Sequence, residues 1–193
     1  MGDTLVNDAE MRAKLGELAD RAEILDCMYR YARGMDRFDR ELVRSAYHAD
    51  AIDHHAMFVG QVDDFLDWAF AYHEAQTCHQ HYLMNHTVEL DGDEAHAETY
   101  YLFVGTDRDP AAPLRVVGGR YVDRLDRRAG RWAIAARVCL VEWQTEATSG
   151  LSPAALDFLA GIGTVARDRT DASYDRPLVV QRAAARSQGD VKE

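Results

Sequence analysis

The sequence predicts an α+β domain in which three helices precede a strongly curved antiparallel sheet. Apolar residues recur every three or four positions in segments up to about residue 75, and then alternate in twos along four long segments. Turn residues separate these four segments, so that neighbouring strands run antiparallel. Because long strands that share one sheet must twist and curl, we expect the sheet to wrap around the first helix.

The first helix is expected over residues 8–33, with Asp8 as its N-cap. Gly34 lies near its end, where a glycine can take φ > 0 and let the chain leave the helix. The positions expected to face the core are Met11, Leu15, Leu18, Ala22, Leu25, Met28 and Tyr29. The elements expected next are a short helix over 39–47, a short strand over 48–55, a hairpin that closes at Gly60 and a third helix over 62–75.

The four long strands are expected over residues 79–90, 94–106, 114–126 and 132–145. Alternation on the first strand places on one face His79, His81, Leu83, Asn85, Thr87 and Glu89. Gly118 and Gly119 lie inside the third strand and indicate a bend or bulge. Ser152 and Pro153 are typical of a helix start, and no firm pattern follows residue 166. We therefore expect a domain over 1–147 and a C-terminal helical extension and tail over 148–193.

The composition predicts a globular, acidic protein. The chain has 193 residues, of which 47% are hydrophobic, so it can bury a proper core. A net charge of −11 argues against non-specific binding to nucleic acid or to an anionic membrane. Cys27, Cys78 and Cys139 are far apart, and we interpret them as reduced residues. Because the N-terminus lacks a signal pattern and no apolar run has transmembrane length, we expect a cytoplasmic protein.

Asp36 and His81 are the residues best suited to acid–base chemistry. Asp36 follows the first helix and is flanked by apolar residues, so its carboxylate can enter an apolar cavity. Imidazole suits a general base because its unperturbed pKa is about 6.5. A carboxylate that accepts the Nδ1–H leaves Nε2 free and stabilises the imidazolium that forms. We expect Asp36 and His81 to form such a pair with Tyr31 beside it, if the chain bends at Gly34.

Each of these residues also has an ordinary structural interpretation. Asp36 is equally typical of a solvated loop acid or a helix cap, His81 of a surface or core histidine, and Tyr31 of plain core. Arg137 can stabilise an oxyanion if it points inward, or it can pair with a structural acid such as Glu142. The residues that we expect to bind the substrate are Asn85, Tyr101, Tyr121 and Trp143.

A metal site is the rival chemistry. His79 and His81 form an H-x-H pair on one strand face, and Asp53, His54 and His55 can supply further ligands. No glutamate follows at the spacing found in cupins, and we expect no metal. The G-x-G-x-x-G, Walker A and G-x-S-x-G motifs are also absent from the sequence, so we expect no cofactor.

Four motifs resemble the SnoaL-like branch of the NTF2-like superfamily. They are Tyr-Ala-Arg-Gly-Met-Asp at 31–36, His-Tyr-x-x-Asn at 81–85, Gly-Gly-Arg-Tyr-Val-Asp-Arg-Leu at 118–125 and Gly-Arg-Trp-Ala-Ile-Ala-Ala-Arg at 130–137. The resemblance implies a cone of curved sheet closed by helices, with a ligand pocket inside. By motif position it implies that Asp36 supports a catalytic His81. It also implies that Tyr31 matches a dehydratase tyrosine and Arg137 a pocket arginine of the dehydrochlorinase.

The resemblance also implies a class of activity. Members include scytalone dehydratase, bile-acid 7α-dehydratase, hexachlorocyclohexane dehydrochlorinase and lyases that release formaldehyde from lignin-derived compounds. We therefore expect a cofactor-independent lyase acting on a small hydrophobic, hydroxylated, aromatic or polycyclic compound, in aromatic compound catabolism. The alternatives are an isomerase or polyketide-type cyclase with the same histidine–aspartate pair, and a non-catalytic accessory subunit similar to dioxygenase β subunits. Because members commonly associate through the outer sheet face, we expect a homo-oligomer, a dimer or trimer.

Overall fold

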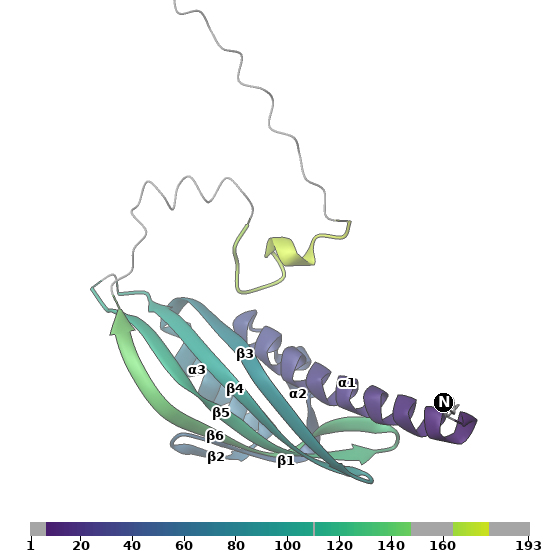
Figure 1. Ribbon diagram of the computed structural model, residues 1–193. Coiled ribbons are helices and arrows are strands. Elements are labelled where there is room, and N and C mark those ends of the chain that lie inside the picture. Colours follow the sequence, from purple (N-terminus) through teal and green to yellow (C-terminus); the bar gives the residue numbers. More distant parts are fainter. Residues whose placement is uncertain (1–6, 110, 148–163, 178–193) are drawn as a thin grey trace, which may run out of the picture.

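The computed structural model describes residues 7–109, 111–147 and 164–177, and its α+β fold with one unclosed, curved sheet confirms the predicted fold class. Its helices are α1 (Asp8–Asp36), α2 (Arg40–Ser45), α3 (Val62–Glu74) and the 3-10 helix η1 (Ala172–Tyr174). Its strands are β1 (Tyr47–His55), β2 (Phe58–Gln61), β3 (Gln76–Asp91), β4 (Glu94–Asp107), β5 (Leu114–Arg128) and β6 (Arg131–Ala147). Figure 1 shows the strands curving around the helices, which lie on the concave side.

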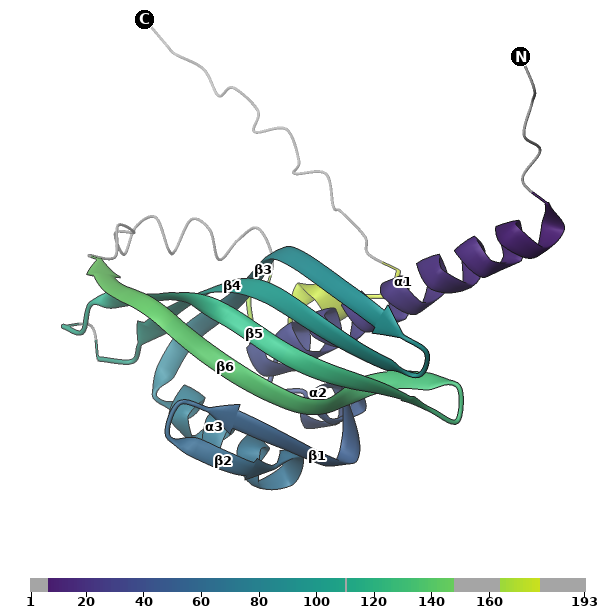
Figure 2. The same cartoon turned by 60° about the horizontal axis from the view of Figure 1, so that its bottom comes forward.

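The sheet has six strands in the order β2-β1-β6-β5-β4-β3. Strands β3 to β6 are the four long strands that the alternation predicts, and each pairs antiparallel with the next. Strands β1 and β2 extend the same sheet beyond β6, next to α3 (Figure 2). The β1–β6 pairing is parallel and joins distant parts of the chain, so no local pattern in the sequence indicates it.

Helix α1 begins and ends differently from the expectation. Its N-cap is Asn7, not Asp8, because the side chain of Asn7 accepts the backbone N–H of Glu10 at 2.9 Å. Glu10 accepts the N–H of Asn7 in return, which completes a capping box. The helix also continues three residues past the expected end, to Asp36.

Gly34 lies inside the helix, so the expected bend at this glycine is wrong. A Cβ at this position would lie 2.6 Å from Cγ2 and 2.8 Å from the backbone nitrogen of Val43. The glycine therefore permits α2 to pack closely against α1. The turn out of the helix falls instead at Phe38, which has a φ of 51°.

The first three turns of α1 do not pack on the sheet, although their apolar residues were expected in the core. Met11, Leu15 and Leu18 are between 46% and 63% exposed, because this part of the helix extends past the sheet (Figure 1). Burial begins at Ile24. The α1 side chains in the core are Ile24, Cys27, Met28, Tyr31, Ala32 and Met35.

Shifts in strand register change which side chains of the sheet face the helices. The register along β3 and β4 changes between Leu83, which pairs with Tyr101, and His86, which pairs with Thr99. The extra residue reverses the alternation, so Asn85 is exposed and His86 is partly buried. The shared face expected for residues 79–89 is therefore wrong after Leu83. The bulge expected at Gly118 and Gly119 is confirmed.

Part of the C-terminal segment packs against the helices. The helix expected from Ser152 lies outside the described residues, and the division of the chain at residue 147 stays a prediction. The guanidinium of Arg167 lies 4.1 Å from the ring of Phe38 and donates to the carbonyl of His73 at 2.9 Å. Asp171 is buried and lies 3.5 Å from Arg37. Residues 164–177 therefore form a packed segment, where no pattern was expected.

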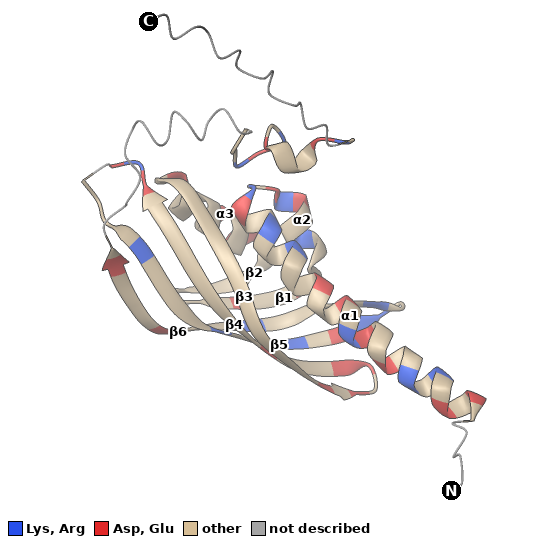
Figure 3. Ribbon diagram, turned by 45° about the horizontal axis from the view of Figure 1, so that its top comes forward, with Lys and Arg blue, Asp and Glu red and all other residues tan. Residues whose placement is uncertain are grey.

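Charged residues are mixed over the surface. Figure 3 shows acidic and basic segments interspersed along α1. Among the described helices, none is long and apolar enough to cross a membrane.

Candidate active site

A cavity of ≈540 Å³ lies between the helices and the sheet. Its wall takes residues from α1, α3 and five of the strands. The aromatic and histidine side chains that line it are Tyr31, His55, Phe65, Trp68, Tyr72, His73, His81, Tyr101, Phe103 and Tyr121. A largely aromatic wall with a few polar groups is suited to a flat, apolar ligand that carries one or two oxygens.

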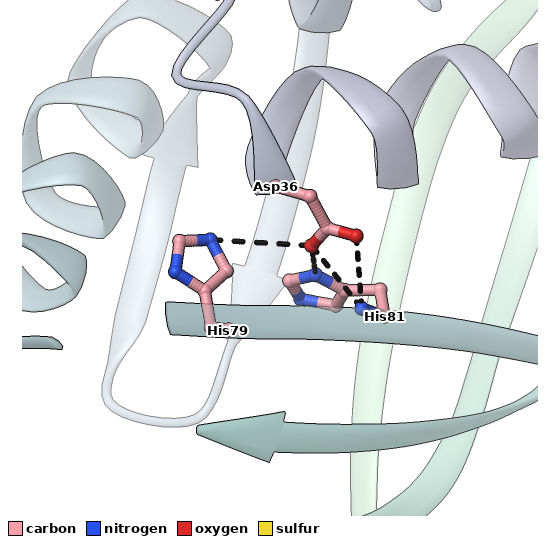
Figure 4. Close-up of side chains that lie close together, drawn as sticks. All are labelled: Asp36, His79 and His81. Carbon is pink, nitrogen blue, oxygen red and sulfur yellow. Dashed lines mark hydrogen bonds and ion pairs between the residues drawn. The ribbon is translucent and has the colours of Figure 1, made fainter. Parts of the chain in front are cut away.

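Asp36 contacts His81, which lines this cavity (Figure 4). Nδ1 of His81 lies 2.7 Å from Oδ1 of Asp36, and the backbone N–H of His81 donates to both carboxylate oxygens at 3.1 Å. Because an ionised carboxylate only accepts, Nδ1 carries a proton, and in the neutral tautomer Nε2 then holds the lone pair. Nε2 has no hydrogen-bond partner in the part of the chain that the structure describes. The geometry therefore suits an oriented general base.

Tyr31 lies beside the pair. Its ring centroid is 6.1 Å from that of His81, and its side chain lines the cavity at 1% exposure. Burial raises the pKa of the Tyr31 hydroxyl, which therefore stays protonated and can donate a hydrogen bond. The expected grouping of Tyr31, Asp36 and His81 is present, because Asp36 ends α1 and reaches β3 without a bend at Gly34.

Two further histidines form a neutral stack under His81. The rings of His73 and His79 lie 4.1 Å apart, and Nε2 of His79 donates to the carbonyl of Met35 at 3.0 Å. Burial and the neighbouring imidazoles lower the pKa of His73 to about 2 and that of His79 to about 4. Both side chains are therefore uncharged at neutral pH and add no positive charge beside His81.

One cluster among the described residues offers three possible metal ligands, namely Asp36, His79 and His81. The two ring nitrogens nearest Asp36 are already hydrogen-bonded, since Nε2 of His79 donates to a carbonyl and Nδ1 of His81 donates to Asp36. A metal ion at this point would have to replace both bonds. The further ligands considered for a metal site, residues 53–55, lie on β1, which three strands separate from β3.

Arg137 does not line the cavity, contrary to the expectation for an oxyanion-binding residue. It is 1% exposed, and its guanidinium donates to both carboxylate oxygens of Asp123 at 2.7 and 2.8 Å. The guanidinium carbon lies 4.3 Å from the ring centroids of both Tyr31 and Tyr121, so Arg137 supports the wall from behind. The alternative partner Glu142 pairs instead with Arg120.

Two of the four expected substrate-binding residues face the cavity. Tyr101 and Tyr121 line it with stacked rings 4.5 Å apart. Asn85 is exposed because of the β3 bulge, and Trp143 is 49% exposed with its indole against Gly118. Lining residues that the sequence analysis did not assign to the cavity include Phe65, Trp68, Tyr72 and His73 of α3 and His55 of β1. The aromatic stripe of α3 was the available signal for three of them.

Comparison of the sequence with known protein families identifies the family of this chain. The model of the SnoaL-like domain matches residues 16–138. The chain belongs to the SnoaL-like domain family, as its motifs predict. No curated protein matches the sequence at a significant level.

Solved structures share the fold at low identity. LinA has a TM-score of 0.67 at 21% identity, with 72% of this chain and 98% of that chain covered. A LinA-type3 hexachlorocyclohexane dehydrochlorinase from Novosphingobium barchaimii has a TM-score of 0.66 at 20% identity, with 72% and 99% covered. A candidate scytalone dehydratase from Novosphingobium aromaticivorans has a TM-score of 0.61 at 16% identity, with 70% and 97% covered. The SnoaL-like chain therefore has the NTF2-like fold that its motifs imply.

Proposed function

We propose that this SnoaL-like protein is a cofactor-independent lyase acting on a small hydrophobic, hydroxylated compound, aromatic or polycyclic. The observation that carries the proposal is the 2.7 Å contact between Nδ1 of His81 and Asp36 at the wall of an aromatic cavity. The dehydrochlorinase and the candidate dehydratase of the same fold support elimination as the reaction class.

In the proposed elimination of water, Nε2 of His81 takes a proton from a carbon of the substrate. The electron pair of that C–H bond forms the new C=C bond, and the neighbouring C–O bond breaks. The hydroxyl of Tyr31 donates a hydrogen bond to the departing oxygen, which leaves as water after it receives the proton from His81. Asp36 stabilises the transient imidazolium. Acid–base help of this kind contributes on the order of 10²–10⁴-fold.

The same pair supports two neighbouring reactions. If His81 takes the proton of a CH₂OH hydroxyl, the O–H electron pair forms the C=O bond of formaldehyde and the C–C bond to that carbon breaks. The electron pair of the C–C bond stays on the remaining carbon, which takes the proton back from His81. If it returns the proton to another carbon, the product is an isomer or a cyclised compound. The mass of the product distinguishes these reactions from dehydration.

The experiment is a mass-spectrometric screen of hydroxylated aromatic, steroid and terpenoid compounds without added cofactor. His81→Ala is the test variant, and His54→Ala is the matched control because His54 is exposed and lies outside the cavity. We expect a product lighter by water from the wild type and from His54→Ala, and at least a hundredfold less from His81→Ala. Near-normal turnover by His81→Ala contradicts the proposal. Tight binding without any turnover indicates an accessory subunit, for which a pull-down would recover a larger, iron-containing chain.

A further inference from the structure

A second histidine–aspartate pair lies at the same cavity, on β1. Nδ1 of His55 is 3.3 Å from Oδ1 of Asp53, and His55 lines the cavity. The Asp53 carboxylate is 0% exposed and accepts the hydroxyl of Tyr47 at 2.7 Å. Three strands separate β1 from β3, so His55 and His81 reach the cavity from opposite parts of the sheet.

A protonated imidazole at His55 balances the charges behind it, where two carboxylates, Asp53 and Asp123, lie beside one guanidinium, Arg137. Asp53 and Arg137 are neighbours across β1 and β6, and Arg137 and Asp123 are neighbours across β6 and β5. The guanidinium of Arg137 binds both oxygens of Asp123 directly, and it is linked to Asp53 only through the hydroxyl of Tyr47. A buried carboxylate without a positive partner is strongly unfavourable. His55 is the cationic partner available to Asp53.

The other titratable groups near this cluster are uncharged. His86 lies near Asp123, but burial lowers its pKa and its Nδ1 is bonded to the hydroxyl of Thr99. The ring of Tyr121 is 6.2 Å from His55, and burial raises the pKa of its hydroxyl. Neither residue supplies a positive charge to Asp53.

Several elements pack against His55 itself. Phe65 and Trp68 of α3 lie 5.2 and 6.1 Å away between ring centroids, and Cys139 approaches from β6. Burial among these groups opposes a charge on the imidazole. The contacts with Asp53 and Cys139 outweigh burial and raise the pKa of His55 to about 9.

We infer that His55 is a positively charged anchor, and that the ligand of this cavity carries an anionic oxygen, a carboxylate or a phenolate, on an aromatic framework. Nδ1 of His55 and Oδ1 of Asp53 face each other at 3.3 Å, and neither buried atom makes a hydrogen bond within the described residues, so their attraction depends on charge. The imidazole also lines the cavity, where it is available to a ligand. The rings of Phe65 and Tyr121 flank the imidazole and can hold the aromatic part. This inference names the class of substrate for the proposed lyase. It rests on the proposed function in one respect, which is that the ligand is a substrate.

Arg115 is the other cation among the described residues that line the cavity. It is bonded to the hydroxyl of Tyr72, and its neighbour across β5 and β6 is Glu146, which also lines the cavity. The carboxylate of Glu146 offsets this charge, so Arg115 is the weaker anchor. Replacing Arg115 therefore tests whether an anionic ligand binds to His55 in particular or to any positive charge in the cavity.

The test compares the binding of 2-naphthoate and 2-naphthamide, which differ in charge but hardly in shape, by calorimetry at pH 7. We expect the wild type to bind the carboxylate at least tenfold more tightly than the amide. His55→Gln should abolish this preference, whereas Arg115→Gln and the exposed-site control His54→Gln should keep most of it. At pH 10, where naphthoate is still charged and His55 is neutral, the wild type should lose the preference.

A preference that persists in His55→Gln, or that Arg115→Gln alone removes, overturns the inference, as does a wild type with no preference. Histidine NMR supplies a second measurement, because the His55 resonance is the one missing from His55→Gln. A midpoint at or below 6.5 for that resonance also overturns the inference. None of these readouts needs turnover, so they stand apart from the His81→Ala assay of the proposed function.

Discussion

At the scale of single residues, the candidate site depends on the hydrogen bonds that Asp36 accepts. Its carboxylate accepts one hydrogen bond from the ring of His81 and two from the backbone N–H of the same residue. The carboxylate therefore fixes the strand position and the ring orientation of His81 together. Such support from a residue held at a helix end holds the base in one tautomer before any ligand arrives.

The first prediction concerns this tautomer. Asp36→Asn keeps the shape of the side chain but removes the charge that stabilises the His81 imidazolium. We expect turnover to fall by about 10²–10⁴-fold, and the ¹⁵N shifts of His81 to show a mixture of tautomers in place of Nδ1–H alone. The exposed-site control Asp64→Asn should change neither. Unchanged ¹⁵N shifts in Asp36→Asn would show that the carboxylate does not set the tautomer.

The second prediction concerns His55 and stability. The folded-state pKa of about 9 lies above the unfolded value of about 6.5. The stabilisation by the His55–Asp53 pair is therefore complete below pH 6.5 and is lost as the pH rises through 9. Denaturant unfolding should show His55→Gln less stable than the wild type at pH 6, with the difference narrowing by pH 10. A difference that is constant over this range would mean that His55 does not change charge there.

At the scale of elements, the sequence predicts where a helix or strand occurs better than it predicts which of its faces is buried. The helical period of residues 8–33 correctly identifies α1, but it does not reveal that the first three turns extend past the sheet. Likewise the alternation along β3 identifies the strand, yet one bulge sends Asn85 outward. Bulges and overhangs are set by the partner strand and by the end of the sheet, and no residue pattern within the element reports either one.

The third prediction uses two glycines of α1. Gly34→Ala should destabilise the protein by about 1–3 kcal/mol, since the new methyl group meets the backbone of Val43 in α2. Gly16→Ala is the matched control, because it adds the same methyl group where nothing lies within 4 Å. It should stabilise the helix by about 0.5–1 kcal/mol. Thermal unfolding of both variants measures this, and equal effects would contradict the close approach of α1 and α2.

At the scale of the whole molecule, the sequence does not predict which strands pair when they lie far apart in the chain. The order of helices and long strands gives the fold class, and motif positions bring together Tyr31, Asp36 and His81, whose roles stay proposals. The parallel β1–β6 pairing was not predicted, because it depends on residues far apart in the chain. The sequence analysis considered His55 only as a metal ligand. Its place at the cavity depends on the β1–β6 pairing, which was not predicted.

The fourth prediction concerns association. Val122 and Val138 are cross-strand neighbours on the sheet face away from the cavity, and both are 38% exposed, with Leu140 beside them. We propose that this face joins copies of the chain as a dimer or trimer. Light scattering should give the mass of a dimer or trimer for the wild type and a smaller mass for Val138→Glu. A control at the exposed end of α1, Leu18→Glu, should leave the mass unchanged. A monomeric wild type contradicts the proposal.

The fifth prediction follows from the neutral histidine stack. The folded-state pKa of His79 is about 4, below the unfolded value of about 6.5, so the unfolded chain binds a proton first as the pH falls. The free energy of unfolding should therefore decrease from pH 6.5 downward, by roughly 3 kcal/mol from this residue by pH 4. His79→Gln removes the titration and keeps a donor for the carbonyl of Met35.

Between pH 6.5 and 5, where few carboxylates titrate, His79→Gln should lose less stability than the wild type. His96→Gln is the control, because His96 is exposed and should keep the wild-type slope. Equal slopes for His79→Gln and the wild type would mean that the stack accepts a proton without cost. His81 would then lie beside a charged imidazole in mild acid, and the rate of any proton transfer to its Nε2 would fall over the same range.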